Sequence, residues 1–108
     1  MAVVAIVAAP ASAAKNPKIA AEVPKSIASK GSLVVASDAT YAPMEFVAAG
    51  GKSVVGVDAD LAKAIGDVLG LRLKVVNATF DTIIPGIESG KYDVGMSSFT
   101  DTKARQRV

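Results

Sequence analysis

Residues 58–76 read DADLAKAIGDVLGLRLKVV and contain a helical pattern that runs directly into a strand pattern. Gly70 separates the two, and glycine suits a helix end because it readily takes a left-handed backbone conformation. The last six residues, LRLKVV, alternate and then become wholly apolar, which indicates a strand. The apolar residues of the helical part recur at the spacing of one helix face. We expect this face to be buried, and its members are Leu61, Ala62, Ile65, Val68 and Leu69.

The residues before this helix predict its cap and a hairpin. Asp58 is expected to cap the helix, since its side chain can accept a hydrogen bond from a free N–H of the first turn. Asp60 complements the positive end of the helix dipole. Residues 37–43 are expected to form a polar loop. Residues 44–48 and 53–57 are short extended runs around Ala-Gly-Gly-Lys, which predicts a β-hairpin.

Further strands and helices flank this unit. Residues 33–36 (LVVA) form a short apolar run, typical of a strand buried on both faces. A second helix is expected over about residues 81–89, with Pro85 in or near its first turn, where a missing N–H costs little. A third strand is expected over residues 92–96, and Thr102 is expected to cap a third helix that begins KARQRV.

The alternation of strands and helices predicts an α/β fold. Connections of this kind give parallel strands with right-handed crossover helices. We expect three parallel strands in the order 2-1-3, with a small hairpin after strand one. In such sheets ligands bind beyond the carboxyl ends of the strands, where residues 37–46 and 97–105 form the expected loops.

The N-terminal segment is predicted to lie outside the fold. Residues 2–14 are uncharged and apolar, are too short to span a bilayer, and contain an Ala-Ser-Ala cleavage pattern. We expect residues 1–13 to be a clipped secretory signal peptide, whose basic start would lie upstream of Met1, and the protein to be exported from the cytoplasm. Residues 14–30 are expected to form a tether or a loose first helix, with one turn at residues 24–29.

Composition excludes several functional classes. The 108 residues include no Cys and no His, which excludes disulfides, thiol nucleophiles, zinc ribbons and a Ser-His-Asp triad. The net charge is +2, and four lysines against one glutamate in residues 15–30 account for the excess, so the folded part is close to neutral. A nucleic-acid partner is not expected, because no clustered basic face is present to displace counterions. We also expect no catalytic group, cofactor or metal site.

The two loops predicted at the sheet edge carry groups that suit a small zwitterion. The hydroxyls of Ser97, Ser98 and Thr100 and the carboxylate of Asp38 can accept from an ammonium, and Tyr41 can pack against a carbon chain. A helix N-terminus with Arg105 in its first turn matches a carboxylate, because the guanidinium can bind both oxygens. The same residues also fit ordinary helix caps and a solvated arginine, and the residue pattern alone leaves both interpretations open.

Four sequence blocks in combination resemble a known family. They read D-A-T-Y-x-P-x-E-F, G-x-D-x-D-L-A-K-A-I, I-I-P-G-I-x-S-G-K-Y-D and M-S-S-x-T-D-T-x-x-R. Residues 33–108 closely resemble the extracytoplasmic solute-binding proteins that serve ABC importers of polar amino acids. The resemblance implies two α/β lobes that close on an amino acid across a hinge, and a permease partner in the membrane. Residues 31–108 would be the N-terminal part of the first lobe, which predicts weak binding by this chain alone.

The resemblance also implies roles for individual residues. Arg105 is implied to grip the ligand α-carboxylate, and Thr100 and the main chain around Ser98 to help hold the carboxylate and ammonium. Tyr41 is implied to stack on the ligand side chain. The side-chain end of the ligand is implied to meet Asp38, Phe80 and Ser97.

Other functions remain compatible with the same lobe. An enzyme on this fold, similar to cyclohexadienyl dehydratase or associated with lytic transglycosylases, would need a catalytic carboxylate from sequence beyond this chain. A sensor module ahead of a membrane-spanning signalling segment is a further alternative. The sequence leaves open which amino acid is bound and whether other domains lie beyond Val108.

Overall fold

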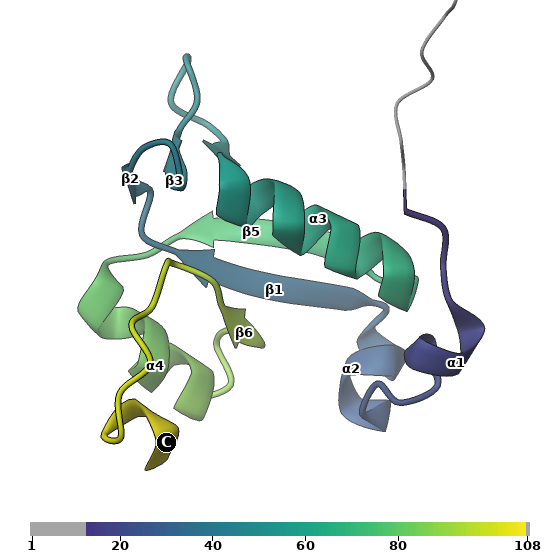
Figure 1. The fold of residues 1–108 in the computed structure, drawn as a ribbon. Coiled ribbons are helices and arrows are strands. Elements are labelled where there is room, and N and C mark those ends of the chain that lie inside the picture. Colours follow the sequence, from purple (N-terminus) through teal and green to yellow (C-terminus); the bar gives the residue numbers. More distant parts are fainter. Residues whose placement is uncertain (1–12, 108) are drawn as a thin grey trace, which may run out of the picture.

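The computed structural model describes residues 13–107. Within them, a three-stranded parallel sheet lies between two helices (Figure 1). Its strands are β1 (Ser32–Ser37), β5 (Arg72–Asn77) and β6 (Val94–Gly95), in the order β5–β1–β6. The α/β class and the strand order 2-1-3 expected from the sequence are therefore confirmed.

The two outer strands pair with β1 to different extents. β1 pairs with β5 along its whole length, from Ser32 opposite Arg72 to Ser37 opposite Asn77. β6 is shorter than the predicted strand over residues 92–96, and only Val94 and Gly95 are paired with β1. The chain leaves the sheet on both sides of this pair because Tyr92 turns into the core and the Ser97 hydroxyl bonds to Glu45.

The core has two parts, one on each face of the sheet. The helix α3 (Val57–Leu69) covers one face, where Leu33, Val35 and Ala62 are buried. The helix α4 (Phe80–Glu88) covers the other face, as Figure 1 shows. The buried residues on that side are Ala36, Ala78, Ile83 and Tyr92.

The predicted buried face of α3 is wrong in two of its five members. Leu61 is 51% exposed and Ile65 is 38% exposed, whereas Ala62 is buried together with Gly66. The helix approaches the sheet through these two small residues, since a Cβ at Gly66 would lie only 3.2 Å from the carbonyl oxygen of Leu71. A close approach along a narrow face leaves the broad side chains pointing away from the sheet.

The helix ends agree only in part with the sequence. Gly70 ends α3 in the left-handed conformation, with φ 68°, as predicted. Asp58 is not the cap of α3: the helix begins at Val57 after Gly56, and the Asp58 carboxylate accepts a hydrogen bond from the N–H of Ser98. Pro85 lies inside α4, beyond its first turn, on the exposed side of the helix.

A small antiparallel sheet extends from the end of β1. Its strands are β2 (Thr40–Tyr41), β3 (Glu45–Val47) and β4 (Val54–Val55), paired in that order. The β3–β4 pair is the predicted hairpin. β2 lies within residues 37–43, for which the sequence predicts a polar loop; this strand brings Tyr41 opposite Glu45.

Residues 14–30 pack on the domain more closely than a tether would. They form two short helices, α1 (Pro17–Ala20) and α2 (Lys25–Lys30), the second close to the single turn predicted at residues 24–29. The N–H of Asn16 donates a 2.8 Å hydrogen bond to the carbonyl of Val68 in α3. The predicted signal peptide lies outside the described residues except for Ala13. Among residues 13–107, none of the helices is long and apolar enough to cross a membrane.

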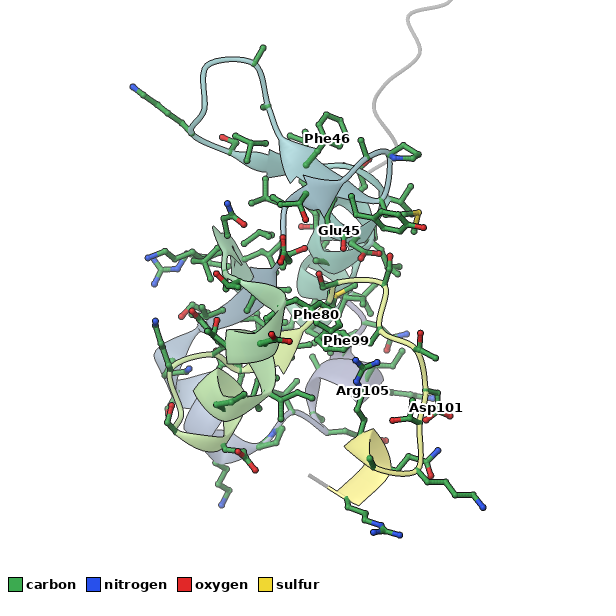
Figure 2. All side chains as sticks on the ribbon, turned by 90° about the vertical axis from the view of Figure 1, so that its left-hand side faces the viewer. Glu45, Phe46, Phe80, Phe99, Asp101 and Arg105 are labelled. Carbon is green, nitrogen blue, oxygen red and sulfur yellow. The ribbon has the colours of Figure 1, made fainter. Side chains whose placement is uncertain are left out.

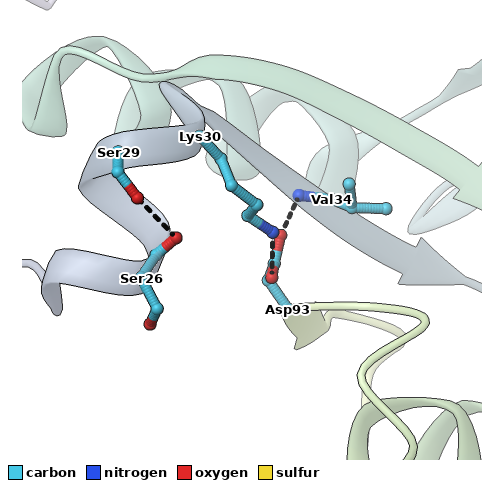
Figure 3. A network of polar contacts seen from close by, with 5 residues as sticks. All are labelled: Ser26, Ser29, Lys30, Val34 and Asp93. Carbon is cyan, nitrogen blue, oxygen red and sulfur yellow. Dashed lines mark hydrogen bonds and ion pairs between the residues drawn. The ribbon is translucent and has the colours of Figure 1, made fainter.

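Asp93 joins α2 to the sheet (Figure 3). Its Oδ1 lies 2.6 Å from Lys30 Nζ, and its Oδ2 accepts a 2.8 Å hydrogen bond from the N–H of Val34. Burial opposes ionisation of this carboxyl, but the bonds from Lys30 and Val34 together outweigh burial and lower the pKa of Asp93 below its ordinary 3.8.

Asp93→Asn is expected to lower the free energy of unfolding by roughly 1 kcal/mol near neutral pH, because it removes the charge that faces the half-exposed Lys30. A lowered carboxyl pKa adds stability above the unfolded-state pKa, and this contribution disappears as the pH falls through the folded-state pKa. The variant should therefore match the wild type in strong acid. Urea unfolding across the acid range measures the difference, with the exposed Glu22→Gln as control. A difference independent of pH would contradict the ion-pair explanation.

Candidate ligand-binding site

Two loops meet beyond the carboxyl ends of β1 and β6, where ligands bind in sheets of this kind. They enclose a concave site of about 310 Å³, here named the main hollow. A second hollow of similar size lies along residues 99–106. The main hollow is lined by Asp38, Thr40, Tyr41, Glu45, Phe80, Ser97 and Ser98.

Five of the seven predicted site residues line the main hollow: Asp38, Tyr41, Phe80, Ser97 and Ser98. The other two, Thr100 and Arg105, line the second hollow. Phe80 connects the two hollows, because its ring lines the main hollow and its centroid lies 5.2 Å from the guanidinium carbon of Arg105 in the second. The seven residues thus form a continuous surface.

The Arg105 side chain is held by two aromatic rings and a carbonyl. Its guanidinium lies over Phe80 and Phe99, at 5.2 and 5.5 Å from the ring centroids, and Figure 2 shows the three side chains in one column. The Nη1 donates a 2.9 Å hydrogen bond to the carbonyl of Thr100. A guanidinium has five N–H donors, so the fork keeps donors for an incoming carboxylate.

The segment that carries Arg105 differs from the predicted α-helix. Residues Arg105–Arg107 form the 3-10 helix η1. Thr102 does act as a cap, since its Oγ1 accepts a 3.2 Å hydrogen bond from the N–H of Arg105. With that N–H engaged and only three residues in the helix, the expected helix N-terminus adds little to a carboxylate site. The guanidinium of Arg105 is therefore the main anion-binding group of this segment.

Asp38 organises the wall of the main hollow. Its Oδ2 accepts a 2.8 Å hydrogen bond from the N–H of Phe80, the first residue of α4, and its Oδ1 accepts one of 2.7 Å from the Thr40 hydroxyl. The carboxylate thus caps α4 from a neighbouring loop and holds the backbone of Phe80 at the start of the helix. A carboxylate has about four acceptor positions, so Asp38 can still accept from a ligand cation.

Ser97 and Ser98 line the main hollow and make hydrogen bonds to other protein groups. The Ser97 hydroxyl is buried; it donates to Glu45 Oε1 at 2.9 Å and accepts from the N–H of Asp38 at 2.9 Å. The Ser98 N–H donates to Asp58 at 2.9 Å, so this one group of the main chain around Ser98 is already engaged. The hydrogen bonds from both serines to Glu45 hold this part of the lining in place.

Thr40 and Glu45 line the main hollow but are not among the predicted site residues, and Glu45 is the buried one of the two. It is 2% exposed, and its two oxygens accept hydrogen bonds from the hydroxyls of Ser97 and Ser98. Burial, together with the neighbouring carboxylate of Asp58, raises the pKa of Glu45 above its ordinary 4.5, against the effect of the serine hydrogen bonds. The one signal for it in the sequence is a glutamate between Met44 and Phe46 in an otherwise apolar strand.

Comparison with known proteins places this geometry in a family. The model of the bacterial extracellular solute-binding proteins, family 3, matches residues 33–108. The chain belongs to this family. The matched residues include both loops of the site and all three strands of the parallel sheet, which confirms the resemblance drawn from the four sequence blocks.

The curated relatives of this solute-binding chain are named as amino-acid-binding proteins. The arginine-binding protein ArgT of Corynebacterium glutamicum is 34% identical over 90 residues, which are 83% of this chain and 29% of ArgT. The histidine-binding periplasmic protein of Salmonella typhimurium is 37% identical over 73 residues, 68% of this chain and 28% of that protein. The solute-binding chain thus spans under a third of the length of these relatives.

Solved structures agree with this assignment. The arginine-bound form of domain 1 from TmArgBP superposes with a TM-score of 0.74 and 44% identity, over 79% of this solute-binding chain and 67% of that chain. The ancestral amino-acid-binding protein AncCDT-1, described as a precursor of cyclohexadienyl dehydratase, gives a TM-score of 0.69 and 40% identity, over 76% and 36% of the two chains.

Proposed function

We propose that this chain is part of the substrate-binding component of an amino-acid ABC importer, acting outside the cytoplasm and without enzymatic activity. Residues 31–108 would form the N-terminal part of one ligand-binding lobe, and delivery to a membrane permease would require the full-length protein. The extracytoplasmic location rests on the family and on the periplasmic relatives. The near-neutral folded part offers nothing that would favour a nucleic acid as an alternative partner.

The observation that carries this proposal is the stacked guanidinium of Arg105 beside the main hollow. The two rings and the Thr100 carbonyl hold it in place before a ligand arrives. A prepositioned fork of N–H donors suits the α-carboxylate of an amino acid, because less side-chain entropy is lost on binding. The ligand side chain would then extend along Phe80 into the main hollow.

The lining of the main hollow favours a cationic side chain. It contains the carboxylates of Asp38 and Glu45 and the rings of Tyr41 and Phe80, and its lining residues include no lysine or arginine among those that the structure describes. Aromatic faces and carboxylates both attract a guanidinium or imidazolium. The relatives named for arginine and histidine support this choice. We therefore propose L-arginine as the ligand to test first.

A binding role is favoured over an enzyme on the same fold. The carboxylate most shielded from water, Glu45, accepts hydrogen bonds with both oxygens and lies 2% exposed. A general acid or base must reach a proton of the substrate, and both oxygens of Glu45 are already engaged by the hydroxyls of Ser97 and Ser98. The curated relatives ArgT and the histidine-binding protein are likewise named as binding proteins.

Calorimetric titration of the 108-residue chain with L-arginine and L-glutamate tests the proposal. Arginine is expected to bind and glutamate not, because glutamate would place a second anion beside Asp38 and Glu45. Affinity should be weak, since the loss of about 4 kcal/mol of contacts from a second lobe corresponds to roughly a thousandfold. Equal binding of both amino acids, or of neither by folded protein, would contradict the assignment.

A further inference from the structure

Glu45 connects the two loops that form the main hollow. Its Oε1 accepts from the Ser97 hydroxyl, and Ser97 in turn accepts from the N–H of Asp38, both at 2.9 Å. The loop after β6 and the loop after β1 are therefore connected through one carboxylate on β3. Because Asp38 also binds the first N–H of α4, this chain of hydrogen bonds extends to the backbone of Phe80.

Ser98 lies between two carboxylates and has one hydroxyl proton to offer. Its Oγ is 3.3 Å from Glu45 Oε2 and 3.3 Å from Asp58 Oδ2. It is also the single non-glycine residue with a positive φ, 45°, among residues 13–107. Such a conformation is costly for a side chain larger than glycine, so the bonds to the two carboxylates must hold it.

The ionisable groups around Glu45 are acidic or neutral. Asp58 faces it from α3, Tyr41 lies opposite it on β2, and Asp38 lies in the loop after β1. With both Glu45 and Asp58 ionised, two like charges share one hydroxyl proton. With Glu45 protonated, its own O–H can donate within the cluster, and the repulsion is removed. Burial and Asp58 both favour this protonated form, which raises the pKa of Glu45.

We propose that Glu45 is a positioning residue whose protonation state sets the geometry of residues 97–98 and, through them, the ligand affinity of the main hollow. A group with a raised pKa stabilises the folded arrangement below its unfolded-state pKa and ceases to do so as the pH rises through the folded-state value. Protonation removes the repulsion between Glu45 and Asp58, whereas the ionised carboxylate accepts more strongly from Ser98, so the two states of Glu45 hold Ser98 differently. The statement on affinity rests on the proposed amino-acid function; the statement on geometry does not.

The geometric part is tested by NMR on the ligand-free chain. The amide resonance of Ser98 should follow a titration step above pH 4.5, the ordinary value for this carboxyl, with the same midpoint as the Glu45 side-chain carboxyl. Glu45→Gln should abolish the step, because an amide stays neutral while it can still accept from Ser97. The exposed Glu88→Gln should retain it. A step that persists in Glu45→Gln, or a Ser98 amide that does not follow Glu45 in the wild type, would overturn the proposal.

The affinity part uses two ligands, because Glu45 also lines the main hollow. L-citrulline keeps the shape of L-arginine without the side-chain charge, so it reports loop geometry without direct attraction to Glu45. Its affinity for the wild type should change about fivefold as the pH rises through the step, a factor at the lower end of ordinary coupling between sites. In Glu45→Gln its affinity should not depend on pH. A wild-type affinity for citrulline that stays constant while the Ser98 amide titrates would overturn this part. If neither ligand binds, the proposed function fails, and the NMR titration still decides the role of Glu45.

Discussion

Arg105→Ala is expected to abolish measurable L-arginine binding by this chain. Removing one partner of a desolvated charge pair costs about 2–5 kcal/mol, which corresponds to between roughly 30-fold and several thousandfold in affinity. The guanidinium is prepositioned by Phe80, Phe99 and the Thr100 carbonyl, so the alanine variant loses both the charge and the prepared geometry. Because a one-lobe site is already weak, a loss of this size takes binding below detection.

Two further variants separate the contribution of the planar Arg105 guanidinium from that of positive charge alone. Arg107→Ala removes an exposed arginine from the same 3-10 helix and should leave binding unchanged. Arg105→Lys keeps a positive charge but loses the planar fork and the stacking on two rings, so its affinity should lie between wild type and Arg105→Ala. Calorimetry measures all three, with circular dichroism to confirm folding. Arginine affinity equal to wild type in folded Arg105→Ala would remove Arg105 from the site.

The sequence predicts those features that depend on local pattern. Gly70 and the alternation of strands and helices specify the end of α3 and the parallel sheet, because left-handed backbone and crossover chirality restrict the choices. The candidate site residues are predicted from hydroxyls and a guanidinium at the carboxyl ends of the strands, and from the resemblance. Their placement in one continuous surface follows from the strand order β5–β1–β6.

The features that the sequence does not predict depend on distances between segments far apart in the chain. Leu61 and Ile65 are exposed because α3 packs closely at Gly66, beside Leu71. Hydrophobic periodicity does not encode this close approach. The local sequence pattern predicts that Asp58 caps a helix, but its hydrogen-bond partner in the structure is Ser98, 40 residues away. A carboxylate in the first turn of one helix can therefore support a distant loop.

The same dependence on distant partners hides Glu45 from sequence reasoning. Its two partners, Ser97 and Ser98, lie 52 and 53 residues along the chain, and alternation in a short hairpin arm gives no sign of a buried carboxylate. Strand β2, which places Tyr41 opposite Glu45, is only two residues long and lacks a periodic pattern. Buried polar groups of this kind require tertiary partners, so only the folded arrangement shows them.

Ile83→Ala is expected to cause a large loss of stability. Ile83 is 0% exposed and packs with Ala36, Ala78 and Tyr92 between α4 and the sheet. Truncating a buried isoleucine to alanine costs about 2–5 kcal/mol, since it loses transfer free energy and leaves a cavity. Domains of ordinary stability have only about 5–15 kcal/mol in total, so this single change removes a large share.

The cavity should collapse poorly because the surrounding backbone is already close. A Cβ at Gly95 would lie 2.7 Å from Ile83 Cγ2, so β6 and α4 meet directly at this side chain. Both elements are fixed by other bonds, β6 through its pairing with β1 and α4 through the Asp38 cap. Urea unfolding of Ile83→Ala against Ile19→Ala measures the effect; Ile19 is 48% exposed, and its truncation should change stability by about 0.5 kcal/mol or less. Equal losses in the two variants would show that the space between α4 and β6 is not the main packing core of this lobe.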